Sequence, residues 1–456
     1  MYDVTVIGGG SGGYAAAIRA AQLGAKVVLA ECAETGGTCV NRGCIPSKVW
    51  LKAADVLQNL KVGKDFGIRA SLEEVDFKAI FGRKSGVSAE IRAGMEALLR
   101  NNGIEFVRGR AVLKSPREVA VEGRTLETKA IIIATGSSLS TPAVPGLQGA
   151  AMTTDEVLEM AKVPASMLVC NAGYIEVEMA FLLSAFGCRV SLVSGNARIL
   201  PKEDSETGQR LGQALRERGV EIIPRASLEF VETSQTGAVC RLSGMKERSV
   251  TVEKVLVSNR TPNTAGLGLS ANGIKLNEDK GICVNDQLMS SVEGVFAVGD
   301  AVGGWMLSHA ASSMAIVAAE NAMGAGNRYP FNLIPRCLWT QPEMAAVGLS
   351  EEEAEMRGYE VETGVFPYSI NGLAMVRNQV DGAVKIVSDA RYGEILGVHI
   401  VGFNATEIIG EAVLAMQLEA TVQELARSIR VHPTFSEAVV DAARDAKNWA
   451  LYLPRS

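Results

Sequence analysis

Short apolar runs, each followed by a glycine-rich or irregular turn and then by a helical pattern, occur twice along this chain. The first copy predicts a strand over residues 2–7, a turn over 8–13, a helix over 11–23 and a strand over 26–30. The second copy predicts the same elements over residues 167–169, 171–176, 174–186 and 189–193. Because strands buried on both faces read as continuous apolar runs, this pattern predicts two parallel, doubly wound sheets.

The pattern changes after Pro262. A short apolar run ends at Gly299-Asp300 and precedes an alanine-rich helix, and from about residue 335 strand-like runs alternate with helices such as 406–417. We therefore predict an α/β protein with two Rossmann-like nucleotide-binding domains and a C-terminal α+β domain. The predicted segments are 1–143, 144–264, a return segment over 265–334 that completes the first domain, and 335–456.

Composition narrows the class of protein. Hydrophobic residues make up 47% and charged residues 21% of the 456 residues, which excludes a largely disordered chain. The net charge of −6, without a dense run of like charges, predicts neither a nucleic-acid partner nor a membrane surface. No apolar run approaches the roughly 18 residues of a membrane span. The first residues show no basic leader, so a cytoplasmic protein is expected.

The first turn carries a dinucleotide-binding pattern. Gly8, Gly10 and Gly13 satisfy G-x-G-x-x-G, with Ser11 and Gly12 between them, and Glu31 ends the next predicted strand. Glycine allows close approach to a pyrophosphate, a helix N-terminus offers free N–H groups, and a carboxylate can accept from ribose hydroxyls. The alternative is a glycine turn that serves packing alone.

Two further strand ends favour a flavin at this first site. Thr135-Gly136 follows an apolar strand, and Gly299-Asp300 follows another. Ligands of doubly wound sheets bind at the carboxyl ends of the strands, where small residues and single acids are expected. For Asp300 alone, a helix N-cap is an equal alternative.

Cys39 and Cys44 form the most informative pair in the sequence. Five residues of ideal helix advance about 7.5 Å, which exceeds the roughly 7 Å Cα separation that a disulfide tolerates. If the two sulfurs bond, the turn must be distorted, and Gly43 is well placed to allow this. A disulfide closing so small a loop adds little stability, which favours redox cycling. Two unrelated core thiols are the alternative.

The stretch GGTCVNRGCIPSK, residues 36–48, resembles the active-site signature of the FAD-dependent pyridine nucleotide–disulfide oxidoreductases, and CIPSK is most similar to the dihydrolipoamide dehydrogenase branch. The resemblance covers essentially the whole chain, because the first glycine turn, ATG, VFAVGD and HPTFSE follow in the family's order. It implies that residues 1–143 and 265–334 bind FAD, that 144–264 form an NAD(P)-binding-like domain, and that 335–456 form a dimerisation domain.

The resemblance also implies roles for single residues. Cys44 would be the charge-transfer thiolate nearest the flavin and Cys39 the interchange sulfur, while Lys48 would lie near the flavin and pair with Glu178. Without the family, Lys48 and Glu178 are two surface charges. The implied cofactor-binding residues are Gly8, Gly10, Ser11, Gly12, Gly13, Glu31, Gly37, Thr38, Lys48, Thr135, Gly136, Gly299 and Asp300 for FAD, with Gly173 and Tyr174 for NAD.

His432 and Glu437, in HPTFSE, match the family's acid–base pair. Attack on a disulfide proceeds through thiolate, so a substrate thiol needs a base, and a carboxylate on the far ring nitrogen fixes the tautomer of that base. In the family the pair comes from the neighbouring subunit, which implies a homodimer. Thr434 and Glu437 also have capping-box spacing, an alternative role that does not exclude the first. His309 and His399 are interpreted as structural.

The second turn departs from the family's pattern. Asn171 and Glu176 replace the first and third glycines, and only Gly173 remains. Asparagine tolerates positive φ, so the turn can survive. Glu176, however, adds bulk and negative charge where a pyrophosphate would lie. Ser194 stands where relatives that use NAD have an acid, although Tyr174 is kept. NAD is therefore a possible cofactor at a degenerate site.

The resemblance implies oxidation of protein-bound dihydrolipoamide to lipoamide, with electrons passing through Cys39–Cys44 and FAD to NAD+. The partners would be a second copy of the chain and a lipoyl-carrier protein or a small dithiol or disulfide, and no metal is expected. One alternative is a related enzyme whose electron partner is a ferredoxin or another flavoprotein. The other is a non-catalytic flavin-bearing scaffold.

Overall fold

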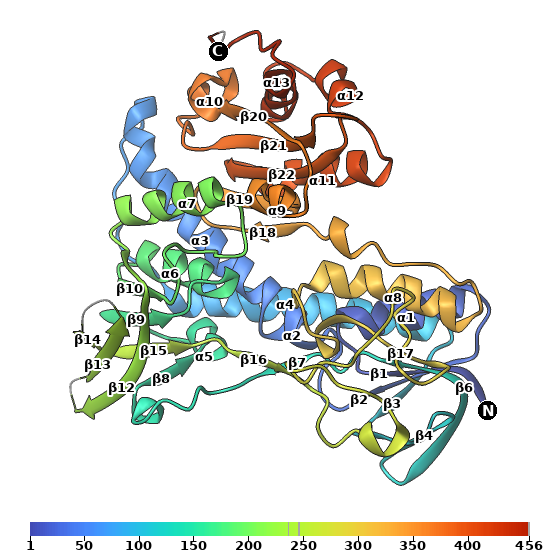
Figure 1. The fold of residues 1–456 in the computed structure, drawn as a ribbon. Helices are drawn as coiled ribbons and strands as arrows, with labels where there is room; N and C mark the ends of the chain where they lie inside the picture. Colours follow the sequence, from blue (N-terminus) through green and yellow to red (C-terminus); the bar gives the residue numbers. More distant parts are fainter. Residues whose placement is uncertain (236, 245–246, 455–456) are drawn as a thin grey trace.

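The structure, a computed structural model, describes residues 1–235, 237–244 and 247–454 and consists of two α/β units and a C-terminal domain (Figure 1). The strands of the first unit are β1 (Tyr2–Ile7), β2 (Val27–Glu31), β3 (Glu105–Arg108), β4 (Ala111–Ser115), β5 (Glu118–Val121), β6 (Arg124–Ile133) and β17 (Val295–Ala297). Its helices are α1 (Ser11–Gln22), α2 (Gly37–Asn41), α3 (Cys44–Val62), α4 (Phe77–Asn101) and α8 (Ser308–Ala322). Strand β17, from the return segment, pairs with β6, and α8 packs along α1.

The first sheet is not wholly parallel, which corrects the sequence-based prediction. Strands β1, β2, β3 and β17 and the second half of β6 are parallel, whereas β4, β5 and the first half of β6 pair antiparallel. The burial pattern of β6 explains the change. Exposed and buried residues alternate in its first half, as in a sheet with one face in water, and Ala130–Ile133 are buried on both faces.

The second unit repeats the first with a five-stranded sheet. Its strands are β8 (Ala151–Thr153), β9 (Ser166–Cys170), β10 (Arg189–Ser194), β11 (Glu221–Pro224) and β15 (Lys254–Val257), all parallel in the order β11-β10-β9-β15-β8. Its helices are α5 (Thr154–Leu158), α6 (Tyr174–Ala185) and α7 (Ser205–Glu217). An antiparallel sheet of β12 (Ala226–Ser234), β13 (Gly237–Gly244) and β14 (Arg248–Val252) lies beside it. Strands β7 (Ser137–Leu139) and β16 (Arg260–Pro262) pair where the chain passes between the two units.

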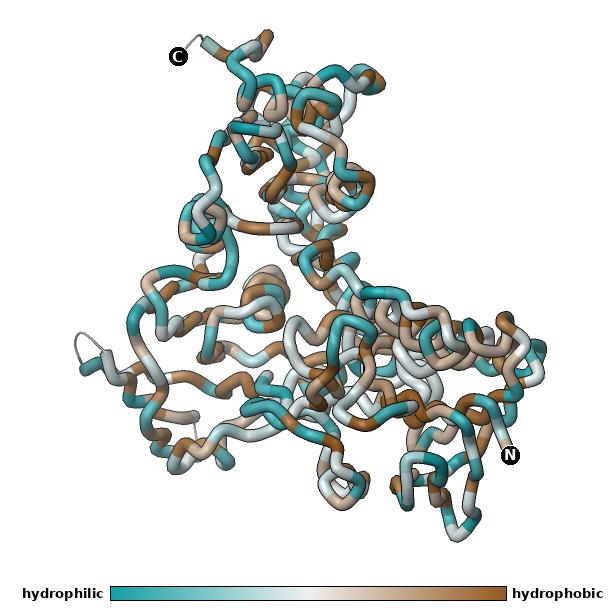
Figure 2. Tube along the Cα trace, turned by 45° about the vertical axis from the view of Figure 1, so that its right-hand side comes forward, coloured by the Kyte–Doolittle hydropathy of each residue, from teal (hydrophilic) through white to brown (hydrophobic). Residues whose placement is uncertain are grey.

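The C-terminal domain, at the top of Figure 1, is an antiparallel sheet covered by helices. Its strands are β18 (Arg336–Leu338), β19 (Glu343–Gly348), β20 (Val361–Pro367), β21 (Ala383–Asp389) and β22 (Ile395–Gly402), in the order β18-β19-β22-β21-β20. Its helices are α9 (Glu351–Met356), α10 (Gly372–Val376), α11 (Ala405–Gln417), α12 (Val422–Arg427) and α13 (Glu437–Ala446). All residues of β21 and β22 are buried, and Figure 2 shows brown, hydrophobic stretches inside this domain as well as in the two units below it.

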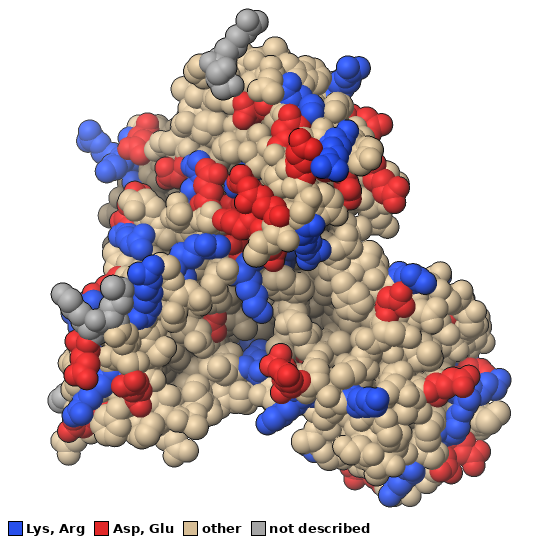
Figure 3. Space-filling view, viewed as in Figure 1, with Lys and Arg blue, Asp and Glu red and all other residues tan. Residues whose placement is uncertain are grey.

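Buried ion pairs connect the C-terminal domain with the second unit. Lys385 of β21 binds Asp204 at 2.9 Å, and Arg336 of β18 binds Glu203 at 2.7 Å. Acidic side chains gather at this junction, while both signs of charge are interspersed over the rest of the face shown (Figure 3). Because removing one partner of a buried ion pair leaves an uncompensated charge, these pairs fix how the domains sit together.

The described residues contain neither a membrane-spanning helix nor a cluster of side chains suited to a metal ion. No helix in that part of the chain is long and apolar enough to span a membrane. Within the same residues, no group of three or more His, Cys, Asp or Glu side chains is arranged to hold a metal ion.

Candidate redox site

The two cysteines meet because the helix between them is interrupted. Helix α2 ends at Asn41, Arg42 and Gly43 leave helical geometry with φ of −141° and −133°, and α3 begins at Cys44. A Cβ on Gly43 would lie 3.2 Å from the Thr38 carbonyl oxygen, so the chain turns back tightly here. Cys39 and Cys44 are free thiols joined by a hydrogen bond. The distortion expected from the spacing is thus present.

The hydrogen bond between the two thiols shifts their pKa values in opposite directions. The hydrogen bond with Cys44 is the largest cause that lowers the pKa of Cys39 to about 6, and hydrogen bonds from Ser308 and Ser11 act in the same direction. The same hydrogen bond, together with burial, raises the pKa of Cys44. The positive charge of Lys48 and the N-terminus of α3 act in the opposite direction, because both stabilise a thiolate on Cys44. The role of Cys44 as charge-transfer thiolate stays a prediction.

Lys48 and Glu178 form an ion pair across the two units. The Lys48 ammonium, one turn along α3 from Cys44, donates to both carboxylate oxygens of Glu178 on α6, at 2.8 and 3.1 Å. It also lies 3.9 Å from the ring centroid of Trp339, whose backbone N–H donates to Glu178 at 3.2 Å. The pair is therefore held in one place beside the cysteines, and the surface-charge alternative does not apply.

The first glycine turn packs so closely that side chains are excluded. Gly8 has a φ of 103°, and a Cβ on Gly13 would lie 1.7 Å from the Gly8 carbonyl oxygen. A Cβ on Gly37 would lie 2.8 Å from the Gly10 Cα. The Ser11 hydroxyl is hydrogen-bonded to the Ser308 hydroxyl at 2.5 Å. The turn, the start of α2 and the start of α8 thus enclose one cradle beside the cysteines.

Glu31 and Asp300, the two acidic residues predicted to bind FAD, lie at or just after the ends of strands, as expected. Glu31 ends β2 and is buried, and its carboxylate accepts from the backbone N–H groups of Gly9 at 2.5 Å and Ala33 at 2.6 Å. A carboxylate offers about four acceptor positions, so Glu31 keeps capacity for a ribose hydroxyl. Asp300 follows β17 and accepts from the Ser137 hydroxyl at 2.5 Å, and Leu307, not Asp300, caps α8.

Several residues of the site were missed by the sequence-based prediction. Arg260 donates to the Ser137 hydroxyl at 2.8 Å, to the Ser137 carbonyl at 2.7 Å and to the Thr38 hydroxyl at 3.3 Å. Thr135 and Asn263 exchange two hydrogen bonds across the same connection. These contacts join Thr38, beside Cys39, to the strand ends of both units. Arg260 and Asn263 lie beside Pro262, after which the hydrophobic pattern of the sequence changes. That change was the sequence signal that could have pointed to these two residues.

His432 and Glu437 are paired at the far end of the C-terminal domain. The His432 Nδ1 atom lies 2.9 Å from one carboxylate oxygen of Glu437, and the other oxygen accepts from the Thr434 N–H at 2.7 Å. Glu437 thus pairs with the histidine as predicted, but the expected Thr434–Glu437 capping box is absent, because α13 begins at Glu437 and the Thr434 hydroxyl bonds Val431 and Ser436. The His432 side chain is 77% exposed.

His309 and His399 bind backbone carbonyl oxygens. The His309 Nε2 atom is 2.7 Å from the Pro335 oxygen, and the fully buried His399 has its Nε2 atom 2.9 Å from the Leu349 oxygen. Burial lowers the pKa of His399, which favours the neutral ring. Both positions agree with a structural interpretation.

The second turn keeps the backbone of the first. Asn171 has a φ of 70°, so asparagine adopts the left-handed conformation that was expected of it. Tyr174 opens α6, packs edge-on against Trp305 with ring centroids 6.0 Å apart, and donates its hydroxyl hydrogen bond to Glu203. Glu176, the third residue of α6, is buried and accepts from the Ser258 hydroxyl.

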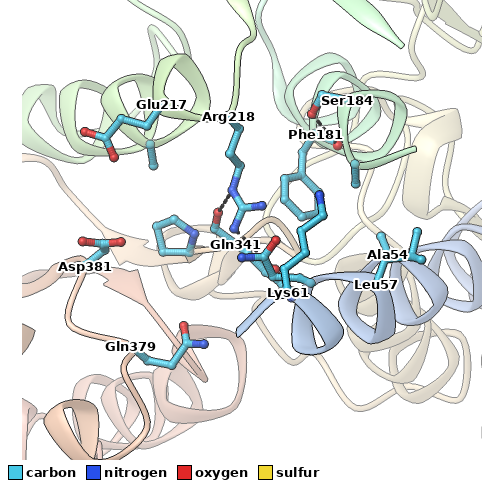
Figure 4. Close-up of a pocket in the computed structure, with 14 residues that line it drawn as sticks. Ala54, Leu57, Lys61, Phe181, Ser184, Glu217, Arg218, Gln341, Gln379 and Asp381 are labelled. Carbon is cyan, nitrogen blue, oxygen red and sulfur yellow. Dashed lines mark hydrogen bonds between the residues drawn. The ribbon is translucent and has the colours of Figure 1, made fainter. Parts of the chain in front are cut away.

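A separate cavity of about 380 Å³ lies where the three units meet. Lys61 of α3, the residues Glu217 and Arg218 at the end of α7, and Asp381 before β21 line it (Figure 4). The Arg218 guanidinium donates to the Gln341 carbonyl at 2.9 Å and lies over the Phe181 ring. The cysteine pair does not line this cavity.

Comparison with known proteins agrees with this geometry. Residues 2–315 match the family model of the pyridine nucleotide-disulphide oxidoreductases, and residues 334–443 match that family's dimerisation domain. A dihydrolipoyl dehydrogenase of Thermus scotoductus is 38% identical, with 99% of each chain covered. The solved structure of LpdA from Mycobacterium tuberculosis is 26% identical with a TM-score of 0.89, over 97% of this chain and 99% of that one.

A further solved structure, the HOCl-induced flavoprotein disulfide reductase RclA from Escherichia coli, is 24% identical with a TM-score of 0.85 and shares the fold. It covers 97% of this chain and 99% of the other. The chain is an α/β oxidoreductase and belongs to the pyridine nucleotide-disulphide oxidoreductase family.

The first unit fits a dinucleotide cofactor. Side chains at Gly8, Gly13 or Gly37 would collide with backbone atoms, so the space in front of the α1 N-terminus stays free for a phosphate group. Glu31 supplies a carboxylate at the next strand end, and Cys39, Cys44 and Lys48 border the same cradle. FAD would therefore be held by these residues with its reactive ring on the cysteine side.

Replacing Gly13 with alanine tests this cradle. The added Cβ would meet the Gly8 carbonyl at 1.7 Å, so we expect the Gly13→Ala protein to lose most of its bound FAD and to be destabilised by about 1–3 kcal/mol. Flavin absorbance per protein and thermal unfolding measure both effects. Gly86→Ala on α4, where an added Cβ meets nothing within 4 Å, is the matched control. Full flavin content in Gly13→Ala would contradict the assignment.

Proposed function

We propose that this protein is a dihydrolipoyl dehydrogenase, which oxidises dihydrolipoamide through the Cys39–Cys44 pair and FAD and passes the electrons to NAD+. The observation that carries the proposal is the hydrogen-bonded pair of thiols at the break between α2 and α3, beside a dinucleotide cradle. Relatives 35–38% identical over nearly their full length carry the name dihydrolipoyl dehydrogenase, and the family uses FAD and NAD(H).

The reaction begins with a proton transfer to His432. An ordinary thiol has a pKa near 8.5, so the substrate dithiol is mostly protonated at neutral pH and needs a base before it can attack. Glu437 holds the His432 ring through Nδ1, which leaves Nε2 free and exposed to take that proton. The carboxylate also stabilises the imidazolium that results.

The exchange then passes through one mixed disulfide. The substrate thiolate attacks the Cys39 sulfur of the Cys39–Cys44 disulfide, a substrate–Cys39 bond forms, and Cys44 leaves as thiolate. The second substrate thiol gives up its proton and attacks its partner sulfur, which closes the lipoamide disulfide and releases Cys39. Two electrons have then moved from substrate to the cysteine pair. Hydrogen bonds from Ser308 and Ser11, which act to lower the pKa of Cys39, favour this sulfur as the leaving group in the second step.

FAD, held by the first glycine turn, Glu31 and Asp300, would supply the two-electron redox chemistry that links the cysteine pair to NAD+. The chain's own residues prepare this transfer. Lys48 places a positive charge beside Cys44 that opposes the rise in the pKa of this thiol caused by Cys39 and by burial, and Glu178 and Trp339 keep the ammonium from moving away. Ser11 and Ser308 hydrogen-bond to Cys39.

Two copies of the chain are needed to complete the site. In Figure 1 the segment before α13, which carries His432, lies at the far end of the C-terminal domain from α2 and the start of α3. A single chain therefore cannot bring His432 to its own Cys39. The dimerisation domain supports a homodimer, in which His432 of one copy would serve Cys39 of the other. We propose a lipoyl-carrier protein as substrate and the cytoplasm as location.

Serine substitutions test the redox pair. We expect Cys39→Ser and Cys44→Ser each to lower dihydrolipoamide:NAD+ turnover at least about a thousandfold, because neither variant can form the disulfide. Cys283→Ser is the control, because Cys283 is a free cysteine outside the site residues described above, and its replacement is predicted to leave the rate unchanged. Turnover by Cys44→Ser at the rate of the unmodified protein would refute the proposed function.

Substitution of His432 tests the acid–base step. His432→Gln removes the base, and general base catalysis contributes typically about 10²–10⁴-fold, so we expect kcat to fall within that range while FAD stays bound. Reduction of the flavin by NADH, which needs no substrate thiol, should keep its rate in this variant. Glu437→Gln should show a smaller loss. An unchanged kcat in His432→Gln would rule out the assigned role.

A further inference from the structure

The two nucleotide-binding units have similar backbone dihedral angles at the residue that caps the helix after the turn. Gly10 caps α1 with φ −75° and ψ −169°, and Gly173 caps α6 with φ −81° and ψ −169°. By the same spacing, Gly8 corresponds to Asn171, and both have positive φ. Gly13 and Glu176 therefore occupy the same place, the third residue of the helix.

The two units differ in what fills that place. At Gly13 no side chain can enter, because its Cβ would lie 1.7 Å from the Gly8 oxygen, so no carboxylate reaches the helix start from this position. At Glu176 a carboxylate folds back over the helix start, with its Oε2 atom 2.8 Å from where a Cβ on Gly173 would be. The residue is 8% exposed, so the carboxylate is held inside the protein.

The hydrogen bonds of this carboxylate are of the kind that an anion at a helix N-terminus accepts. The Ser258 hydroxyl donates to it from the loop that follows β15. The backbone N–H groups of Gly173 and of Glu176 itself lower the pKa of Glu176, although burial is the larger effect and raises that pKa overall. No Lys or Arg is among the causes of the shift. The helix start and Ser258 are therefore the partners of this carboxylate.

The rest of a nucleotide site remains beside it. A cavity of about 190 Å³ opens at the carboxyl ends of β9, β10 and β15, lined by Asn171, Gly195 and Asn259 among others. Ligands of doubly wound sheets bind at this edge. Asn171, the first residue of the turn before α6, lines this cavity, so the cavity lies next to the turn that Glu176 follows.

We propose that Glu176 is a built-in anion in the pyrophosphate cradle of the second unit, which NAD(H) must displace in order to bind. Resting on the proposed function, this makes Glu176 a specificity-determining residue that sets a high Kd and a high KM for the dinucleotide. A pyrophosphate and a carboxylate cannot share the same N–H groups, and two negative charges at close range repel each other. The binding free energy of the dinucleotide is thereby reduced.

Nucleotide binding to the FAD-loaded protein tests this inference. Titration calorimetry with NAD+ would compare the unmodified protein with Glu176→Gln, which keeps the shape and removes the charge, and Glu176→Gly, which restores the glycine pattern. We expect about tenfold tighter binding in Glu176→Gly and a smaller gain in Glu176→Gln. In steady state the KM for NAD+ should fall in parallel, with kcat and the KM for dihydrolipoamide unchanged.

A matched control is Glu156→Gln. Glu156 is also the third residue of a helix in the second unit, but its carboxylate closes an exposed capping box with Thr153. NAD+ affinity should not change in this variant. Equal NAD+ affinity in the unmodified protein, Glu176→Gln and Glu176→Gly would overturn the proposal.

Two outcomes separate this inference from the proposed function. If dihydrolipoamide fails to reduce the bound flavin, the proposed function fails, while the calorimetric comparison still decides the role of Glu176. If dihydrolipoamide reduces the flavin but NAD+ binds to none of the variants, the Glu176 proposal is overturned, and an electron acceptor such as a ferredoxin or another flavoprotein is favoured instead.

Discussion

The hydrogen bond between the Cys39 and Cys44 thiols depends on Arg42 and Gly43, whose backbone dihedral angles are not helical. Had α2 continued through Arg42 and Gly43 into α3, the two cysteines would lie more than a turn apart and would not meet. The break turns the chain back, and it leaves Cys44 at a new helix N-terminus, where negative charge is favoured. The chemistry of the protein rests on this local interruption, and the surrounding units hold its two ends in place.

Both nucleotide-binding units use one backbone plan but are specialised by the residue at the third helical position. Gly13 places no side chain in the first cradle, which suits a cofactor that stays bound. In the second cradle the carboxylate of Glu176 lies beside Gly173 at the helix start. A weakly held, exchanging dinucleotide is compatible with a substrate that must arrive and leave in each cycle. The fold alone does not distinguish these two cases.

Much of the fold follows from the sequence, because strands β1, β2, β9 and β10 and helices α1 and α6 begin and end within two residues of their predicted bounds. The apolar patterns that predict these elements depend only on residues close together in the sequence. The antiparallel half of β6 was not expected, because a strand that changes partners along its length has no single period. The positive φ of Asn171 was foreseeable from the tolerance of asparagine for that conformation.

The site was foreseeable where motifs carry it and not where distant segments meet. Lys48 and Glu178 were named together only through family resemblance, and their contact with Trp339 joins three distant parts of the chain. Arg260 reaches Ser137 and Thr38 across the connection between the units, for which no local pattern exists. The hydrogen bond from Ser258 to Glu176 likewise joins residues distant in the sequence, so the sequence alone does not predict it.

The central claim, that Cys39 and Cys44 alternate between disulfide and dithiol, is tested most directly by mapping their redox state. Oxidised protein and protein reduced anaerobically with dihydrolipoamide would be alkylated, digested and examined by mass spectrometry. We predict a Cys39–Cys44 disulfide in the first sample and alkyl groups on both sulfurs in the second. Two free thiols in the oxidised protein, or a disulfide that dihydrolipoamide leaves intact, would contradict the account.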